Sequence, residues 1–212
     1  FLSLVSCLSL AFFTACHVAE NKQQAGISSF FNAIPAVDTM RFEVSQDDEP
    51  LPGDTIPNVQ FLTEIGAGLM QGIDFLDDSG EAKFIGRSRF PLNEGFEAYL
   101  VDVHQNWFKN QSLFLFDQKS KKFSDRVTVA EWYGGDGGQI LTGSWLVDFD
   151  KDGGKDLVRR EIEHWMEMDE EEPRDTFQHR AALLLWKNGQ FMETAGVDSA
   201  ALVRDFPIKS AW

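Results

Sequence analysis

Four carboxylates lie close together in the stretch DFDKDGGKDL, which begins at residue 148. They occupy positions 1, 3, 5 and 9 of that stretch, and position 6 is a glycine: Asp148, Asp150, Asp152, Asp156 and Gly153. Negative charges at this spacing repel one another, and packing does not require them. A hard divalent cation removes the conflict, because Ca²⁺ takes about six to eight oxygen ligands. The spacing therefore predicts a calcium site made of the four side chains and a backbone carbonyl near Gly154.

The flanking residues distinguish between kinds of calcium loop. An EF-hand carries a glutamate at loop position 12, where this chain has Arg159, and no helical pattern follows. Apolar and charged residues instead alternate over residues 157–168, which predicts a half-buried strand. The short apolar run at residues 144–147 predicts another strand before the loop.

The order strand, D-x-D-x-D-G-x-x-D-L, strand resembles the calcium loop of FG-GAP and VCBS-type repeats, found in integrin-like propellers and many secreted bacterial proteins. The resemblance covers only residues 145–158, and it implies a calcium-binding role for the four aspartates. A single copy of the motif does not make a propeller, and no repeat period of propeller length is evident. The alternative interpretation is a solvated acidic turn between two strands.

The first fifteen residues carry no charge and are rich in Leu, Phe, Ser and Ala. They are too short to span a bilayer as a helix and are typical of the apolar region of a signal peptide. Residues 13–16, FTAC, resemble a bacterial lipobox, which predicts cleavage before Cys16 and lipidation of that cysteine. Phe13 departs from the commoner Leu, and Cys7 fits the motif locally but leaves almost no apolar region before the cut. An ordinary signal peptide, with Cys16 incidental, is the alternative.

These features predict an exported chain held in the bacterial cell envelope, at the outer membrane or in the periplasm, with a lipid anchor as its contact with the membrane. A secreted protein is the alternative. After the signal peptide, residues 1–15, a polar linker over residues 16–26 leads to a single β-rich domain over residues 27–212. Cleavage before Cys16 leaves one cysteine, so no internal disulfide forms, and a bound calcium is expected to supplement the core.

The charge balance excludes one class of partner. The chain has 34 acidic and 19 basic residues, a net charge of −15. A surface of this sign offers nothing to release counterions from a phosphate backbone, so we expect no nucleic-acid binding.

From residue 72 onward, short strand-like runs alternate with turn signals at roughly ten-residue spacing. Strands are expected over residues 97–103, 112–116, 126–132 and 183–186, and Asn188-Gly189 favours a tight hairpin turn. This texture predicts an all-β fold, an antiparallel meander forming a sandwich or a barrel-like sheet. Residues 27–70 are expected to be irregular: residues 27–34 suit either a strand or a short helix, and Gly66 and Gly68 weaken a helix over residues 61–70.

Other groups of polar and aromatic residues point less directly to function. Glu161 and Glu163 share a strand face, as a hydrolase with paired carboxylates needs, but a solvated face that pairs with Arg159 is commoner. His164 is expected to be half-buried. The acidic run at residues 169–175 and the glycine-rich run at residues 134–138 are predicted to be loops. Five tryptophans lie in or beside predicted strands, where core packing is commoner than sugar stacking.

The sequence thus favours a lipid-anchored, calcium-stabilised binding or structural module, without catalysis, whose protein or glycan ligand it does not identify. Two alternatives remain: a secreted hydrolase acting on polysaccharide through Glu161 or Glu163, and a carbohydrate-binding module. The hydrolase needs a second carboxylate facing the first across a cleft. The carbohydrate-binding module needs exposed tryptophans.

Overall fold

A computed structural model describes residues 26–36, 38–44, 53–73, 82–135, 137–168 and 172–209. The expected signal peptide, the lipobox ending at Cys16 and the first part of the acidic run expected as a loop over residues 169–175 lie outside these residues.

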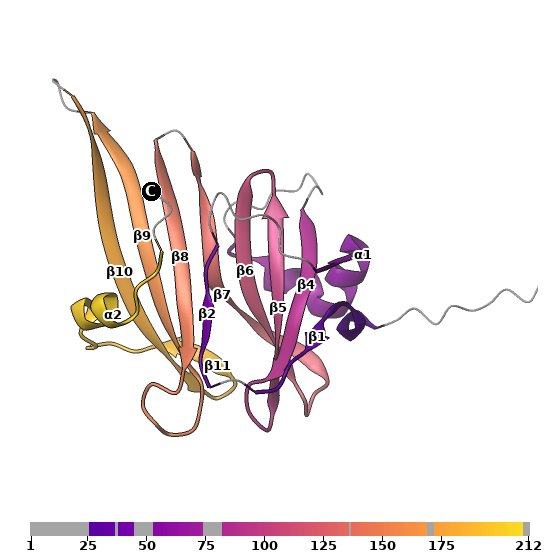
Figure 1. The fold of residues 1–212 in the computed structure, drawn as a ribbon. Helices are drawn as coiled ribbons and strands as arrows, with labels where there is room; N and C mark the ends of the chain where they lie inside the picture. The colour runs from indigo at the N-terminus through magenta and orange to yellow at the C-terminus, as the bar shows by residue number, and fades with distance from the viewer. Residues whose placement is uncertain are drawn as a thin grey trace, which may run out of the picture.

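The body of the protein is an antiparallel meander in which each strand pairs with the next along the chain (Figure 1). Its strands are β4 (Lys83–Pro91), β5 (Phe96–Gln105), β6 (Phe108–Asp117), β7 (Lys122–Gly135), β8 (Gly138–Val147), β9 (Asp156–Met168), β10 (Pro173–Lys187) and β11 (Gln190–Glu193). The all-β prediction is confirmed. The hairpin turn at Asn188-Gly189 is also confirmed, since both residues have positive φ, 53° and 87°, as a tight two-residue turn requires.

Short elements from the N-terminal segment add to this meander. Three short strands complete an 11-stranded mixed sheet: β1 (Asn32–Ala33) and β3 (Asp54–Ile56) pair with β4, and β2 (Met40–Phe42) pairs with β8. The first of these pairings is parallel. The helical elements are η1 (Ile27–Phe30), α1 (Asn58–Phe61), η2 (Leu62–Gly66) and η3 (Ala67–Met70).

The structure gives more detail than the sequence did for residues 27–34 and for residues 61–70. Residues 27–34 contain both a 3₁₀ turn and a strand. The helix expected over residues 61–70 consists of short helical pieces, because Gly66 takes a φ of 106°, outside the helical region.

The sheet opens between β7 and β8. β7 pairs with β6 through residues 122–132 but with β8 only through residues 131–135. In the gap, β2 pairs with residues 144–146 of β8. The sheet also curls. As a result, the ring of Phe96 on β5 lies 5.2 Å from the ring of Trp186 on β10, five strands away in the sheet. The curl gives the meander a concave inner face.

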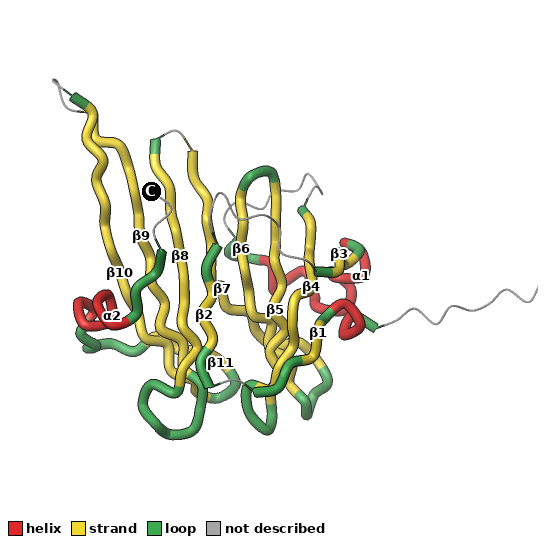
Figure 2. Tube along the Cα trace, in the orientation of Figure 1, coloured by secondary structure: helices red, strands yellow, loops and turns green. Residues whose placement is uncertain are grey.

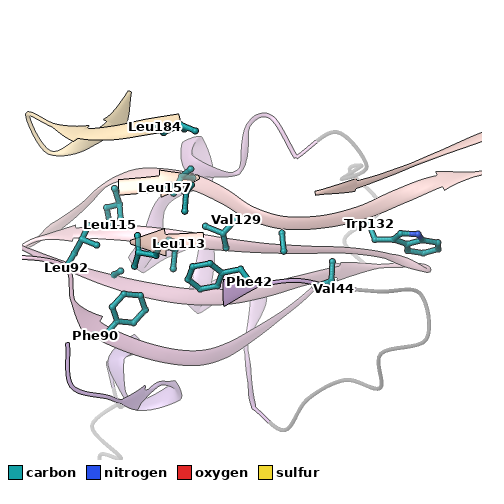
Figure 3. Packing of buried hydrophobic residues seen from close by; sticks show 14 of the residues in the cluster. Phe42, Val44, Phe90, Leu92, Leu113, Leu115, Val129, Trp132, Leu157 and Leu184 are labelled. Atoms are coloured by element: carbon teal, nitrogen blue, oxygen red, sulfur yellow. The ribbon is translucent and has the colours of Figure 1, made fainter. Parts of the chain in front are cut away.

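Among the described residues, buried apolar side chains form three clusters. The largest cluster lies inside the curl and includes Phe42, Leu113, Val129 and Leu157 (Figure 3). A second cluster on β4–β6 is completed by apolar residues of η1, α1 and η2. A third, smaller one includes Leu202 of the C-terminal helix α2 (Ser199–Asp205), which the sequence analysis did not foresee.

A buried arginine attaches α2 to the sheet. Arg160 on β9 is 2% exposed, and its Nη1 donates to the carbonyl oxygens of Val203 and Phe206 at 2.7 and 2.8 Å. Its Nε donates to the carbonyl oxygen of Arg180 at 3.3 Å. Last-turn carbonyls of a helix have no partner within the helix, so the guanidinium satisfies groups that burial would otherwise leave unpaired.

The strands place their turns at two opposite ends of the sheet (Figure 2). The β8–β9 loop and the β10–β11 turn lie at one end, and the β5–β6 and β7–β8 turns lie at the other. Two predicted loops are wrong in part. Pro173–Asp175 belong to β10. In the run at residues 134–138, Gly134 and Gly135 end β7, Gly137 lies in the turn, and Gly138 begins β8.

Candidate metal site

The acidic stretch connects β8 to β9, as the sequence predicts. The antiparallel pair Val147↔Asp156 closes the loop at its base. Two residues of the loop take positive φ, Lys151 at 63° and Gly153 at 87°, and these sharp local turns fold the chain back between two strands that run straight. The loop is therefore held by the sheet at both ends.

Three of the four aspartates converge. Asp148, Asp150 and Asp156 each offer a carboxylate oxygen, and these oxygens lie within 4.8 Å of one another. Such a spacing suits oxygen ligands around one cation, since Ca²⁺–oxygen distances are about 2.3–2.6 Å. Acidic side chains also gather on protein surfaces without a cation, so the cluster alone does not establish a metal.

Backbone N–H groups of the loop orient these carboxylates. Asp148 Oδ2 accepts from the Gly153 amide at 3.2 Å, and Asp150 Oδ1 accepts from the Asp152 amide at 3.2 Å. Asp156 Oδ2 accepts from the Phe149 amide at 3.1 Å. These bonds fix the carboxylates within the loop and draw them together despite their like charge.

Asp156 differs from the other two because it is buried, at 3% exposure. Its Oδ1 accepts from the Trp186 amide at 3.0 Å, which ties the loop to β10. Burial raises the pKa of Asp156, the amides of Trp186 and Phe149 lower it, and the nearby charge of Asp150 raises it. A cation beside this carboxylate would offset both the burial and the repulsion.

One carboxylate oxygen is left over. Asp148 Oδ1 is buried and has no hydrogen-bond partner among the described residues. A buried acceptor without a partner is costly, at about 1–3 kcal/mol, and proteins rarely leave one. The residues present therefore fit a calcium ion, which would give this oxygen its missing partner.

The remaining members of the predicted site lie differently. Asp152 is not among the converging carboxylates; its Oδ1 accepts from the Gly154 amide at 2.7 Å. Gly154 comes so close to that carboxylate that a Cβ there would lie 2.9 Å from Asp152 Oδ1. The structure thus assembles three of the four aspartates named from the sequence and assigns the fourth to bracing the loop.

The paired glutamates of β9 are engaged with an arginine of the neighbouring strand. Arg180 contacts Glu161 at 2.9 Å and Glu163 at 3.2 Å, while Arg159, the partner expected from sequence, lies 3.8 Å from Glu193. Glu161 and Glu193 also line one hollow of about 460 Å³ on this face, so the hydrolase alternative stays an untested prediction.

The expected half-buried position of His164 is observed. Its side chain is 18% exposed, and its Nε2 lies 2.8 Å from Asp175 Oδ1. The tryptophans do not share one environment: Trp132 is 2% exposed and Trp107 is 61% exposed. Sequence periodicity could not separate them, because Trp107 lies in a tight turn beside a strand.

Among the described residues, no helix is long and apolar enough to cross a membrane.

No protein-family model, curated protein or solved structure matches this chain. The likeness to the FG-GAP and VCBS-type loop therefore still depends on the loop residues alone.

Proposed function

We propose that this protein is a calcium-stabilised binding or structural module of the bacterial cell envelope. The observation that carries the proposal is the convergence of Asp148, Asp150 and Asp156, one of which has a buried oxygen, Asp148 Oδ1, without a partner among the described residues. Calcium suits this set because all of its ligands are oxygens and the loop is irregular enough for a flexible coordination shell.

The ion would act on the fold and not on a substrate. Bound calcium would supply positive charge to the carboxylates of the β8–β9 loop, and the residues of the chain would hold the ion and connect the loop to the sheet. Asp156 transmits the order of the loop to β10 through the Trp186 amide, so fixing the loop also fixes this part of β10. A ligand that binds only the folded state stabilises it by about 2.7 kcal/mol at a hundredfold excess over its dissociation constant.

Thermal unfolding of the purified protein, in calcium and in EGTA, tests this role. We expect calcium to raise the melting temperature by about 5–10 °C, the shift that corresponds to that free energy in a domain of this size. The double variant Asp148→Asn, Asp150→Asn should lose the shift.

A matched control separates coordination from the general relief of negative charge. Asp54→Asn, Glu94→Gln removes the same two charges from exposed positions away from the loop. This variant should keep the calcium shift. An equal rise in melting temperature in the loop variant, or no rise in the unaltered protein, would contradict the calcium proposal.

We also propose attachment to the membrane through a lipid on Cys16. The support is the FTAC motif and the uncharged stretch before it. Expression of the full reading frame in a bacterium, followed by membrane fractionation and mass spectrometry of the N-terminal peptide, tests it. We expect a lipidated Cys16 in the membrane fraction and a Cys16→Ser variant in the soluble fraction; an unmodified cysteine would favour secretion.

A further inference from the structure

A hollow lies at the end of the sheet opposite the acidic loop. Its volume is about 440 Å³, within the usual range for small-ligand sites. The β5–β6 turn contributes Trp107, β7 contributes Trp132, and β9 contributes His164 and Met166. Glycines of the β7–β8 hairpin form much of the remaining wall.

Because glycine has no side chain, the backbone of this part of the wall is not covered by side-chain atoms. A Cβ built on Gly135 or Gly137 meets nothing within 4 Å, so space beside both residues is open. Gly134 is required for another reason: its φ is 148°, and a Cβ there would lie 2.3 Å from the Gly138 carbonyl oxygen. The hairpin is thus built so that a ligand can approach main chain directly.

An exposed indole stands at the rim. The Trp107 Nε1 donates to the Gly134 carbonyl oxygen at 3.4 Å, which holds the side chain across the glycine segment. The indole is nevertheless 61% exposed. A large aromatic surface held in place but left in water is suited to stacking against a ring.

Two buried polar atoms of the wall lack partners among the described residues. One is the Nε1 of Trp132, a donor on a side chain that is 2% exposed. The other is the Oε1 of Gln139, an acceptor. An indole N–H can only donate and an amide oxygen can only accept, so the two together call for a ligand with groups of both kinds.

The lining limits the charge of that ligand. Among the described residues that line it there is no Asp, Glu, Lys or Arg, and the ionisable side chain among them, His164, is bonded to Asp175. A charged ligand would find no opposite charge among these described residues, and a net charge of −15 opposes anions. A hydroxyl group both donates and accepts, so a hydroxylated ring meets each requirement.

We propose that this hollow binds a neutral saccharide, with one ring stacked on Trp107 and hydroxyl groups bonded to Trp132 Nε1 and Gln139 Oε1. This assignment rests on the proposed binding role of the module and names its class of ligand. It does not depend on the calcium, because the acidic loop lies at the other end of the sheet (Figure 1).

Saturation-transfer NMR and calorimetric titration with neutral hexasaccharides test the proposal, using α-glucan, β-glucan, mannan, xylan and chitin oligomers. The unaltered protein should bind at least one of them at millimolar concentration or below. Trp107→Ala should weaken that binding roughly tenfold or more through loss of stacking. Trp132→Phe keeps an aromatic side chain, although a smaller one, removes the donor and should weaken binding several-fold.

Trp145→Phe is the matched control. Trp145 Nε1 also lacks a partner, but its ring lies under the guanidinium of Arg41, 4.9 Å from the ring centre, outside the hollow. This variant should bind as the unaltered protein does. Thermal unfolding of each variant checks that it is folded.

Binding of none of the five oligomers overturns the proposal, and so does binding that Trp107→Ala and Trp132→Phe leave unchanged. Repeating the titration in EGTA separates the two proposals. Saccharide binding that depends on Trp107 in a protein without a calcium shift would leave the hollow standing and remove the calcium role.

Discussion

The two ends of the β8–β9 hairpin show opposite chemistry. At one end, Val147 and Asp156 close a loop that carries four aspartates. At the other end, Gln139 and His164 are paired across the same two strands, beside glycines and a hollow whose described lining has no Asp, Glu, Lys or Arg. The comparison teaches that one rigid hairpin can present two unrelated surfaces, because a strand fixes its ends relative to each other while leaving their side chains free to differ.

The ends also differ in how their polar groups are satisfied. The aspartates of the loop accept backbone N–H groups, and one oxygen, Asp148 Oδ1, is left over. At the hollow, a donor and an acceptor on different side chains are left over. The first arrangement asks for positive charge and the second for a neutral group that both donates and accepts.

The largest effect is expected at Asp156. Asp156→Asn leaves either the Trp186 or the Phe149 amide without its acceptor, which outweighs the relief of removing a buried charge, so we expect a loss of about 2–3 kcal/mol in the free energy of unfolding without calcium. Urea denaturation in EGTA measures it. Asp150→Asn is the control, since Asp150 is exposed and should change the metal-free stability little. Equal losses in both variants would mean that burial does not set the two residues apart.

At the opposite end, Gly134→Ala should cost about 2 kcal/mol, since alanine is strained at a φ of 148° and its Cβ meets the Gly138 carbonyl oxygen. The loss should be the same in calcium and in EGTA. Gly135→Ala, where the space is open and φ is not positive, should be neutral or slightly stabilising. A neutral Gly134→Ala variant would contradict the strained hairpin.

Within the acidic loop, the two exposed aspartates should not contribute equally. Asp150→Ala removes a converging ligand and should weaken calcium binding about tenfold or more. Asp152→Ala removes a carboxylate that braces the Gly154 amide and acts on the ion mainly through screened charge, so about threefold is expected. Calcium titration by calorimetry measures both. A larger effect at Asp152 would place its carboxylate in the coordination shell, as the sequence motif implies.

The smallest effect expected is the energetic coupling between the two ends of the hairpin, which should be close to zero. Trp107→Ala combined with Asp148→Asn should change the free energy of unfolding by the sum of the single changes, to within about 0.5 kcal/mol. Distant sites without shared partners are additive, and these two lie at opposite ends of the sheet. A larger coupling, measured by a double-mutant cycle, would show that the hairpin transmits changes between its ends.

The strands and the loop were predictable because their signals are local. Alternation of apolar and charged residues identified β9, Asn188-Gly189 identified the last hairpin, and the aspartate spacing identified the loop. The boundaries were less predictable: Pro173–Asp175 resemble a loop in sequence but continue β10, since pairing with β9 supplies their backbone partners. Helix α2 was missed because its burial depends on Arg160, a residue 39 or more positions earlier in the chain on a strand.

By itself, the sequence determined the fold class, the sign of the surface charge and the place of the acidic loop between two strands. Each of these follows from composition or from neighbours within a few residues. Only the tertiary structure decided which carboxylates converge, that Arg180 pairs with Glu161 and Glu163, and that Trp107 and Trp132 line one hollow. These facts depend on the register between strands and on the curl of the sheet, and both are set by the packing of residues far apart in the chain.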